Sequence, residues 1–173
     1  GLLNLSNQQK SSSVDQAESV LLLPIFDGVI SELRASNTNQ EKRVHIELKC
    51  DVESAFAHVT LAPSSFRRAI SNLLNNAVEA SPYFGTVTVS LKHDIKRILV
   101  EITDEGRGFP GEMLDQLGVE GFSTKENGNG LGIFQARQAV KQTDGAIHFR
   151  NRETGGAVVN LILPISNPPS DAV

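Results

Sequence analysis

The sequence has a single cysteine, a single methionine, a single tyrosine and no tryptophan, and aromatic residues make up only 5% of its 173 positions. The lone cysteine, Cys50, cannot form a disulfide within the chain. One cysteine and four scattered histidines also give none of the ligand spacings of a zinc site. We therefore expect a cytoplasmic, reducing environment, with neither a disulfide nor a zinc centre.

Long apolar runs and an excess of basic residues are absent too. Apolar runs such as residues 21–26 fall far short of the roughly 20 residues that span a bilayer, so we expect no membrane insertion by this chain. Lys and Arg total 16 against 20 Asp and Glu, which argues against a nucleic-acid partner. The chain begins at Gly1 without a signal peptide. We interpret it as a cytosolic fragment of a longer protein, and membrane attachment of that parent stays open.

The composition, 39% apolar and 21% charged, predicts one packed globular domain. We place the domain at residues 21–165. Residues 1–20 are polar and are interpreted as a linker or the end of an upstream helix, and residues 166–173 as a disordered tail.

Hydrophobic periodicity predicts an irregular alternation of helices and strands. The clearest helical pattern runs over residues 66–80, with apolar residues three and four positions apart. We expect helices over residues 24–36, 66–80 and 131–143, and strands over residues 44–50, 57–61, 85–92, 97–103, 146–150 and 157–163. This order favours an α+β fold, a two-layer sandwich in which helices cover one face of a mixed sheet.

Polar residues interrupt the strongest predicted helix along one stripe. Asn72, Asn76 and Glu79 share this stripe at 100° per residue, although asparagine is a mediocre helix former. A solvated helix face is the simpler interpretation. The alternative is the polar wall of a ligand site, since amide oxygens suit Mg²⁺ near substrate phosphates.

Two glycine-rich motifs follow. Asp104-x-Gly106-x-Gly108 ends a predicted strand, and the sequence around Gly128-x-Gly130 immediately precedes a predicted helix. An acidic turn and a hinge loop are the simpler interpretations. Bare N–H groups at a helix start also favour anions, and a carboxylate at a strand end can accept a hydrogen bond from an exocyclic amine. No P-loop motif and no dinucleotide-fold or Ser/Thr-kinase signature is present.

Taken in order, these motifs resemble the ATP-binding catalytic domain of two-component sensor histidine kinases. That domain has the Bergerat fold, shared with gyrase, heat-shock protein 90 and the mismatch-repair ATPases. Residues 72–77 resemble the N box, residues 104–108 the G1 box, residues 122–125 the end of the F box and residues 128–132 the G2 box. The resemblance implies a mostly antiparallel sheet and covers about residues 20–165.

The resemblance also implies a site for ATP and Mg²⁺. In it, Asn76 binds the metal with Asn72 assisting, and Asp104 holds the adenine amine. Residues 110–130 would form a lid over the nucleotide. The ATP-binding residues implied are Asn72, Asn76, Asp104, Gly106, Gly108, Ser123, Thr124, Lys125, Gly128, Asn129, Gly130, Leu131 and Gly132.

Two positions depart from the family pattern. Many members have Lys and Tyr where this chain has Glu79 and Ala80, so a lysine–phosphate contact and an aromatic contact to the nucleotide are missing. Lys125 and Arg68 are the candidates to supply the charge.

The resemblance implies a kinase that hands the γ-phosphate to a histidine on a dimerisation domain, from which a response regulator takes it. Gyrase-type relatives place a general-base Glu where this chain has Asn72, so water activation is not expected. His93 precedes an acid, as phosphoacceptors do, but it follows the N box and lies between predicted strands. We therefore expect no catalytic histidine in the fragment and no autophosphorylation. An anti-sigma-factor-type Ser kinase and a nucleotide-dependent interaction module are the alternatives.

Overall fold

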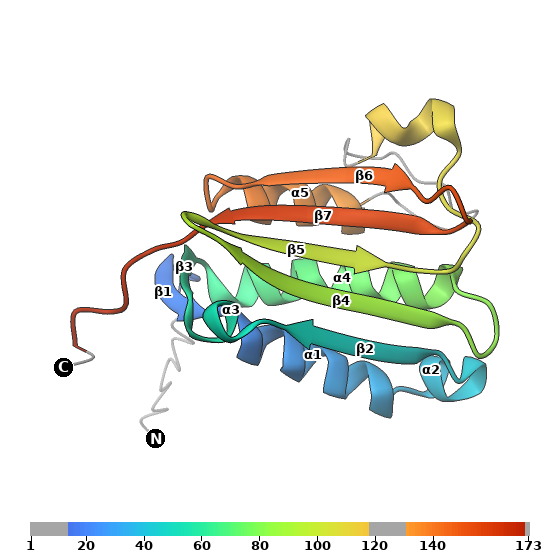
Figure 1. Cartoon of the computed structure of the whole chain (residues 1–173), viewed down its shortest axis with the longest axis horizontal. Helices are drawn as coiled ribbons and strands as arrows, with labels where there is room; N and C mark the ends of the chain where they lie inside the picture. Colours follow the sequence, from blue (N-terminus) through green and yellow to red (C-terminus); the bar gives the residue numbers. More distant parts are fainter. Residues whose placement is uncertain (1–13, 118–130, 172–173) are drawn as a thin grey trace, which may run out of the picture.

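The computed structural model describes residues 14–117 and 131–171. It forms two layers, a five-stranded sheet and a set of helices packed on one of its faces (Figure 1). The sheet has the order β2-β4-β5-β7-β6, and a separate small sheet pairs β1 with β3. The strands are β1 (Glu18–Leu21), β2 (His45–Cys50), β3 (His58–Leu61), β4 (Thr86–Asp94), β5 (Arg97–Thr103), β6 (Ala146–Asn151) and β7 (Ala157–Pro164). The helices are α1 (Leu22–Ala35), α2 (Asn37–Lys42), α3 (Val52–Phe56), α4 (Pro63–Ala80), the 3-10 helix η1 (Gly111–Gln116) and α5 (Leu131–Lys141).

The strand pairing confirms the expected mixed, mostly antiparallel sheet. Strand β2 runs parallel to β4, whereas β4–β5, β5–β7 and β7–β6 are antiparallel. Alternate residues of the central strands point into the core, as the period of two requires. Val87, Val89, Val100 and Ile102 are each at most 1% exposed.

Helix α4 is the central helix of the layer (Figure 1). It begins at Pro63, whose fixed φ and missing N–H suit the first turn, and it ends before Pro82. Its apolar stripe is buried as the periodicity predicted, at Phe66, Ala69, Ile70, Leu73, Leu74, Ala77 and Val78. The opposite stripe carries the polar residues Asn72, Asn76 and Glu79.

Distant segments hold both ends of α4. At its start, the Asp15 carboxylate accepts hydrogen bonds from the backbone N–H groups of Ser64 and Ser65. At its end, the Lys42 ammonium donates to the carbonyls of Glu79 and Ser81. Each charge has the sign that the helix dipole favours at that end.

Several short elements differ from the sequence-based expectation. Residues 18–20, expected in the linker, form β1 together with Leu21, and residues 166 and 167, expected in the tail, contact Ser19 and β3. Helices α2 and α3 were not predicted, because each is six residues or fewer and shows no apolar period. The turn expected around His93 is shorter, since β4 continues to Asp94. These pieces depend on pairing with distant segments, which local periodicity does not reveal.

Candidate functional site

A narrow cavity of about 40 Å³ lies where α4, α5 and the central strands meet. It brings Asn76 of the α4 stripe together with Asp104 and Gly108 of the glycine motif after β5. Its walls are Leu73, Asn76, Ala77, Ala80, Ile102, Asp104, Gly108, Phe109, Ile133, Phe149, Ala157 and Val159. The cavity is thus mainly apolar, with one amide and one carboxylate among its lining residues.

Asp104 is the buried acid of this cavity, with an exposed fraction of 6%. Its Oδ1 accepts hydrogen bonds from the backbone N–H groups of Gly106 at 2.8 Å and Ala157 at 3.2 Å. Burial raises the pKa of this carboxyl above its usual value, although these two hydrogen bonds and the charge of Arg152 oppose the rise. Both described hydrogen bonds use one oxygen, so Oδ2 remains to accept from a ligand amine.

The loop after Asp104 packs directly on the end of α4. A methyl group at Gly106 would lie 2.4 Å from the carbonyl oxygen of Ala80, so only glycine allows this approach. On the other side, the Arg152 guanidinium donates to the Asp104 carbonyl at 3.0 Å. The acid is therefore held between a helix end and the β6–β7 turn.

Asn72 lies one helical turn before Asn76 and faces the start of α5. Its Nδ2 donates to the carbonyl of Gly132 at 3.4 Å and to Oε1 of Gln135 at 3.3 Å. A methyl group at Gly132 would be in ordinary contact with Asn72, 3.6 Å from its Cβ. The N box and the end of the G2 motif, with Leu131 at the first position of α5, are thus neighbours.

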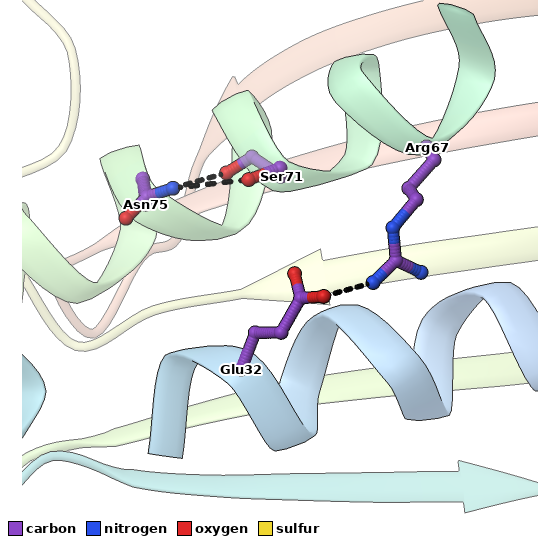
Figure 2. A network of polar contacts seen from close by, with 4 residues as sticks. All are labelled: Glu32, Arg67, Ser71 and Asn75. Carbon is purple, nitrogen blue, oxygen red and sulfur yellow. Dashed lines mark hydrogen bonds and ion pairs between the residues drawn. The ribbon is translucent and has the colours of Figure 1, made fainter. Parts of the chain in front are cut away.

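The third asparagine of this helix has a different place. Figure 2 shows Asn75 donating to the carbonyl and hydroxyl oxygens of Ser71, on its own helix. One turn earlier, Arg67 of α4 pairs with Glu32 of α1. Neither Asn72 nor Asn75 lines the cavity, but Asn72 reaches across to α5, whereas the described hydrogen bonds of Asn75 stay within its own helix.

The amide oxygens near the cavity fit a magnesium ion that phosphates also bind. In the described part of the chain, no group of three or more His, Cys, Asp or Glu residues could hold a metal. Mg²⁺ commonly takes one or two protein oxygens together with substrate phosphates and waters. The amides of Asn72 and Asn76 can supply such oxygens.

Part of the expected phosphate loop lies outside the described residues. This holds for Ser123, Thr124, Lys125, Gly128, Asn129 and Gly130.

Sequence reasoning missed several residues of the site. It assigned no role to Phe109, Phe149 or Ile133, which line the cavity, or to Asn151 and Arg152, which contact the loop after β5. Phe109 follows the glycine motif directly, so its neighbourhood was a usable signal. Phe149 and Asn151 are more than forty positions from Asp104 and gave no local signal.

Comparison with known proteins agrees with this geometry. Residues 62–167 match the family described as histidine kinase-, DNA gyrase B-, and HSP90-like ATPase. The chain belongs to this ATPase family. The matched region runs from the residue before α4 to beyond β7 and so contains every described residue of the cavity.

Curated relatives of this chain include a sporulation kinase and a sensor protein. The chain is 32% identical over 104 residues to sporulation kinase C of Bacillus subtilis, covering 60% of this chain and 24% of that protein. It is 37% identical over 99 residues to the sensor protein DegM of a Bacillus species, covering 57% and 26%. The chain thus spans about a quarter of the length of these relatives.

Solved structures confirm the ATPase fold. The mycobacterial sensor histidine kinase MprB superposes with a TM-score of 0.75 at 24% identity, covering 88% of this chain and 99% of that one. Full-length ShkA in complex with AMPPNP gives a TM-score of 0.74 at 19% identity, covering 89% and 32%.

Within the described residues, no helix is both long and apolar enough to cross a membrane.

Proposed function

We propose that this chain is the ATP-binding catalytic domain of a sensor histidine kinase. It presents the γ-phosphate of Mg-ATP to a histidine on a dimerisation domain that is not in this chain. The observation that carries the proposal is the shared cavity of Asp104 and Asn76, with the start of α5 beside Asn72. Family membership and the sensor-kinase relatives support it.

The base is held at the buried end of the site. Adenine enters between the apolar walls, and its exocyclic amine donates to Asp104. The Oδ1 atom of that residue is already held by Gly106 and Ala157, so the carboxylate is fixed before the base arrives. A carboxylate accepts from the adenine amine but repels the carbonyl oxygen that guanine carries at the same position, so the site selects adenine.

The phosphates lie toward the start of α5. Backbone N–H groups at a helix N-terminus bind anions, and Gly132 lies at this end beside Asn72. Lys125 and the amides of residues 128–132 complete the phosphate site. Mg²⁺, when bound, neutralises charge on the phosphates, and Asn76 with help from Asn72 supplies amide oxygens to it.

The site favours phosphotransfer over hydrolysis. A water-activating residue must be basic and must lie near the γ-phosphate. Asn72 cannot accept a proton from water, because a side-chain amide is not basic. Its Nδ2 donates to Gly132 and Gln135 instead. Asp104, the one carboxylate that lines the described cavity, serves the opposite end of the nucleotide.

The proposal also includes two partners. The nucleophile is a histidine of the parent's dimerisation domain, and a response regulator receives the phosphoryl group afterwards. A Ser kinase of the anti-sigma-factor type would use the same nucleotide site with a serine hydroxyl as the nucleophile. Its phosphoserine product is stable in acid, whereas phosphohistidine is acid-labile.

The test incubates the fragment with γ-labelled ATP and Mg²⁺, alone and with the parent's dimerisation domain added in trans. We expect no label on the fragment alone and acid-labile label on the added domain. An Asn76→Ala fragment should lose the transfer, whereas His93→Gln should keep it, because His93 lies in β4 outside the cavity lining. Acid-stable label on a Ser or Thr would replace the proposal with the Ser-kinase alternative. Label on the fragment alone would overturn the requirement for a second domain.

A further inference from the structure

The cavity has an aromatic pair. The rings of Phe109 and Phe149 both line it, with centroids 5.9 Å apart and planes at 89°. On the α4 side, Ala80 offers only a methyl group. We propose that Phe109 and Phe149 form the wall that stacks on the adenine base, and that Asn151 is the positioning residue for Phe109. The inference rests on the proposed function, in which the base occupies this cavity.

Phe149 is the fixed half of this wall. It lies on β6, and the guanidinium carbon of Arg137 from α5 is 5.5 Å from the centroid of its ring. The same guanidinium donates a hydrogen bond of 2.6 Å to the carbonyl of Leu117, just after η1. A cation over an aromatic face, itself held by a backbone carbonyl, restrains the ring from one side.

Phe109 is held by its backbone. Its N–H donates to Oδ1 of Asn151 at 2.7 Å, and its carbonyl accepts from Nδ2 of the same amide at 2.5 Å. The Asn151 side chain thus pairs with both the backbone N–H and the backbone carbonyl of Phe109. This fixes the backbone of Phe109 and with it the direction of the bond to its side chain. Asn151 and Phe149 are two positions apart on β6, so the same face of one strand supplies the ring and the holder of its neighbour.

The size of the cavity assigns movement to Phe109. About 40 Å³ is far below the roughly 300–1,000 Å³ of ordinary small-molecule sites, so a base enters only when side chains separate. Phe149 is restrained by Arg137, and the backbone of Phe109 by Asn151. Of the two rings, we assign the movement to the Phe109 side chain, which rotates away from its edge-to-face pairing with Phe149.

The experiment measures Mg-ADP binding by calorimetry. It detects contacts between the nucleotide and the two rings by NMR, on protein with isotope-labelled phenylalanine. In the wild type we expect nuclear Overhauser effects between adenine protons and both the Phe109 and the Phe149 rings. Phe109→Leu and Phe149→Leu keep apolar volume but lose the aromatic face. Each should weaken binding about five- to a hundred-fold, while Phe109→Tyr should bind like the wild type. Phe56→Leu is the control, because that ring is 75% exposed on α3 and outside the cavity lining.

Asn151→Ala separates positioning from folding. Asn151 is exposed, so the melting temperature should change little, while the adenine contact to Phe109 weakens and the contact to Phe149 persists. Asn160→Ala on β7, also outside the cavity lining, should change neither contact.

The outcomes separate the two proposals. A wild-type chain that does not bind Mg-ADP saturably would overturn the proposed function and this inference together. A wild type that binds, with leucine variants that bind equally well or with no contact from adenine to either ring, would overturn the aromatic wall alone. Equal loss of both ring contacts in Asn151→Ala would overturn the positioning role.

Discussion

Asp15 caps the distant helix α4, since its Oδ2 accepts a hydrogen bond of 2.6 Å from the backbone N–H of Ser65, fifty positions later in the chain. The N-cap residue of α4, Ala62, makes no such bond with its own side chain. The segment before β1 is therefore tied to the helix that carries Asn72 and Asn76. In a longer parent protein, this contact would join whatever precedes the domain to one wall of the nucleotide site.

Removing this cap should lower stability in a pH-dependent way. Hydrogen bonds, the side chain of Ser65 first, hold the pKa of Asp15 below its usual 3.8. A carboxyl with a lowered folded pKa stabilises the fold above its unfolded pKa and loses that effect as the pH falls through the folded pKa. Asp15→Ala should therefore lower the melting temperature by the same amount at pH 7 and pH 5, and by less as the pH falls below 3.8.

Thermal melts of the wild type and of Asp15→Ala, from pH 7 to below pH 3.8, test the prediction. Asp27→Ala, at an exposed position of α1, serves as the control for loss of a surface carboxylate. A deficit of Asp15→Ala that stays constant down to pH 2.5 would contradict the assigned role.

The cap shows where sequence reasoning reached its limit. All seven residues expected on the apolar stripe of α4 are buried, because helical periodicity is a local property of the sequence. Nothing near Asp15 indicates that its partners are Ser64 and Ser65, since only the pairing of β1 with β3 brings them together.

The site divides in the same way. Asp104 and Gly106 lie within three positions, and their spacing indicated a ligand loop correctly placed beside α4. The bonds between Phe109 and Asn151 span 42 positions, and they form because β6 ends beside that loop. The motifs therefore indicated polar residues that lie at the cavity, while the pairing of Phe109 with Asn151 could be seen only in the fold.

Asp104→Asn should change base selection without unfolding the chain. An asparagine oxygen in the place of Oδ1 can still accept from Gly106 and Ala157, but an amide NH₂ then replaces Oδ2. The lost charge-assisted hydrogen bond should cost ATP roughly 1.5–3 kcal/mol of binding free energy, and GTP much less. Calorimetric titration with both nucleotides measures the difference. An equal loss for ATP and GTP would show that Asp104 does not contact the base.

The pH dependence of nucleotide binding should report the same carboxyl. Burial raises the pKa of Asp104 above 3.8, so in the free chain the proton is released at a higher pH than from an exposed aspartate. Because Oδ1 accepts from Gly106 and Ala157, the added proton lies on Oδ2, the oxygen left for the adenine amine, and the protonated form binds that amine more weakly. ADP affinity should therefore fall as the pH drops through this raised pKa, at a pH where exposed aspartates are still ionised. In Asp104→Asn, this part of the pH dependence should vanish, and its persistence would assign the titration to another group.

Two neighbouring glycines of the β6–β7 turn provide a matched test of how the acid is held. Gly155 and Gly156 have φ values of +91° and +97°, so alanine is strained at either position, by about 1–3 kcal/mol. A methyl group at Gly155 meets nothing within 4 Å, whereas one at Gly156 would lie 2.0 Å from the carbonyl oxygen of Asp104.

Gly155→Ala should thus lose stability from strain alone and keep its ADP affinity. Gly156→Ala should lose more stability, by over about 3 kcal/mol in total, because the Asp104 backbone must also shift. Its remaining folded fraction should bind ADP weakly, since the shift moves the carboxylate that receives the base. Chemical denaturation and ADP titration of the two variants give both quantities, and equal results for the pair would refute the close packing of Gly156 on Asp104.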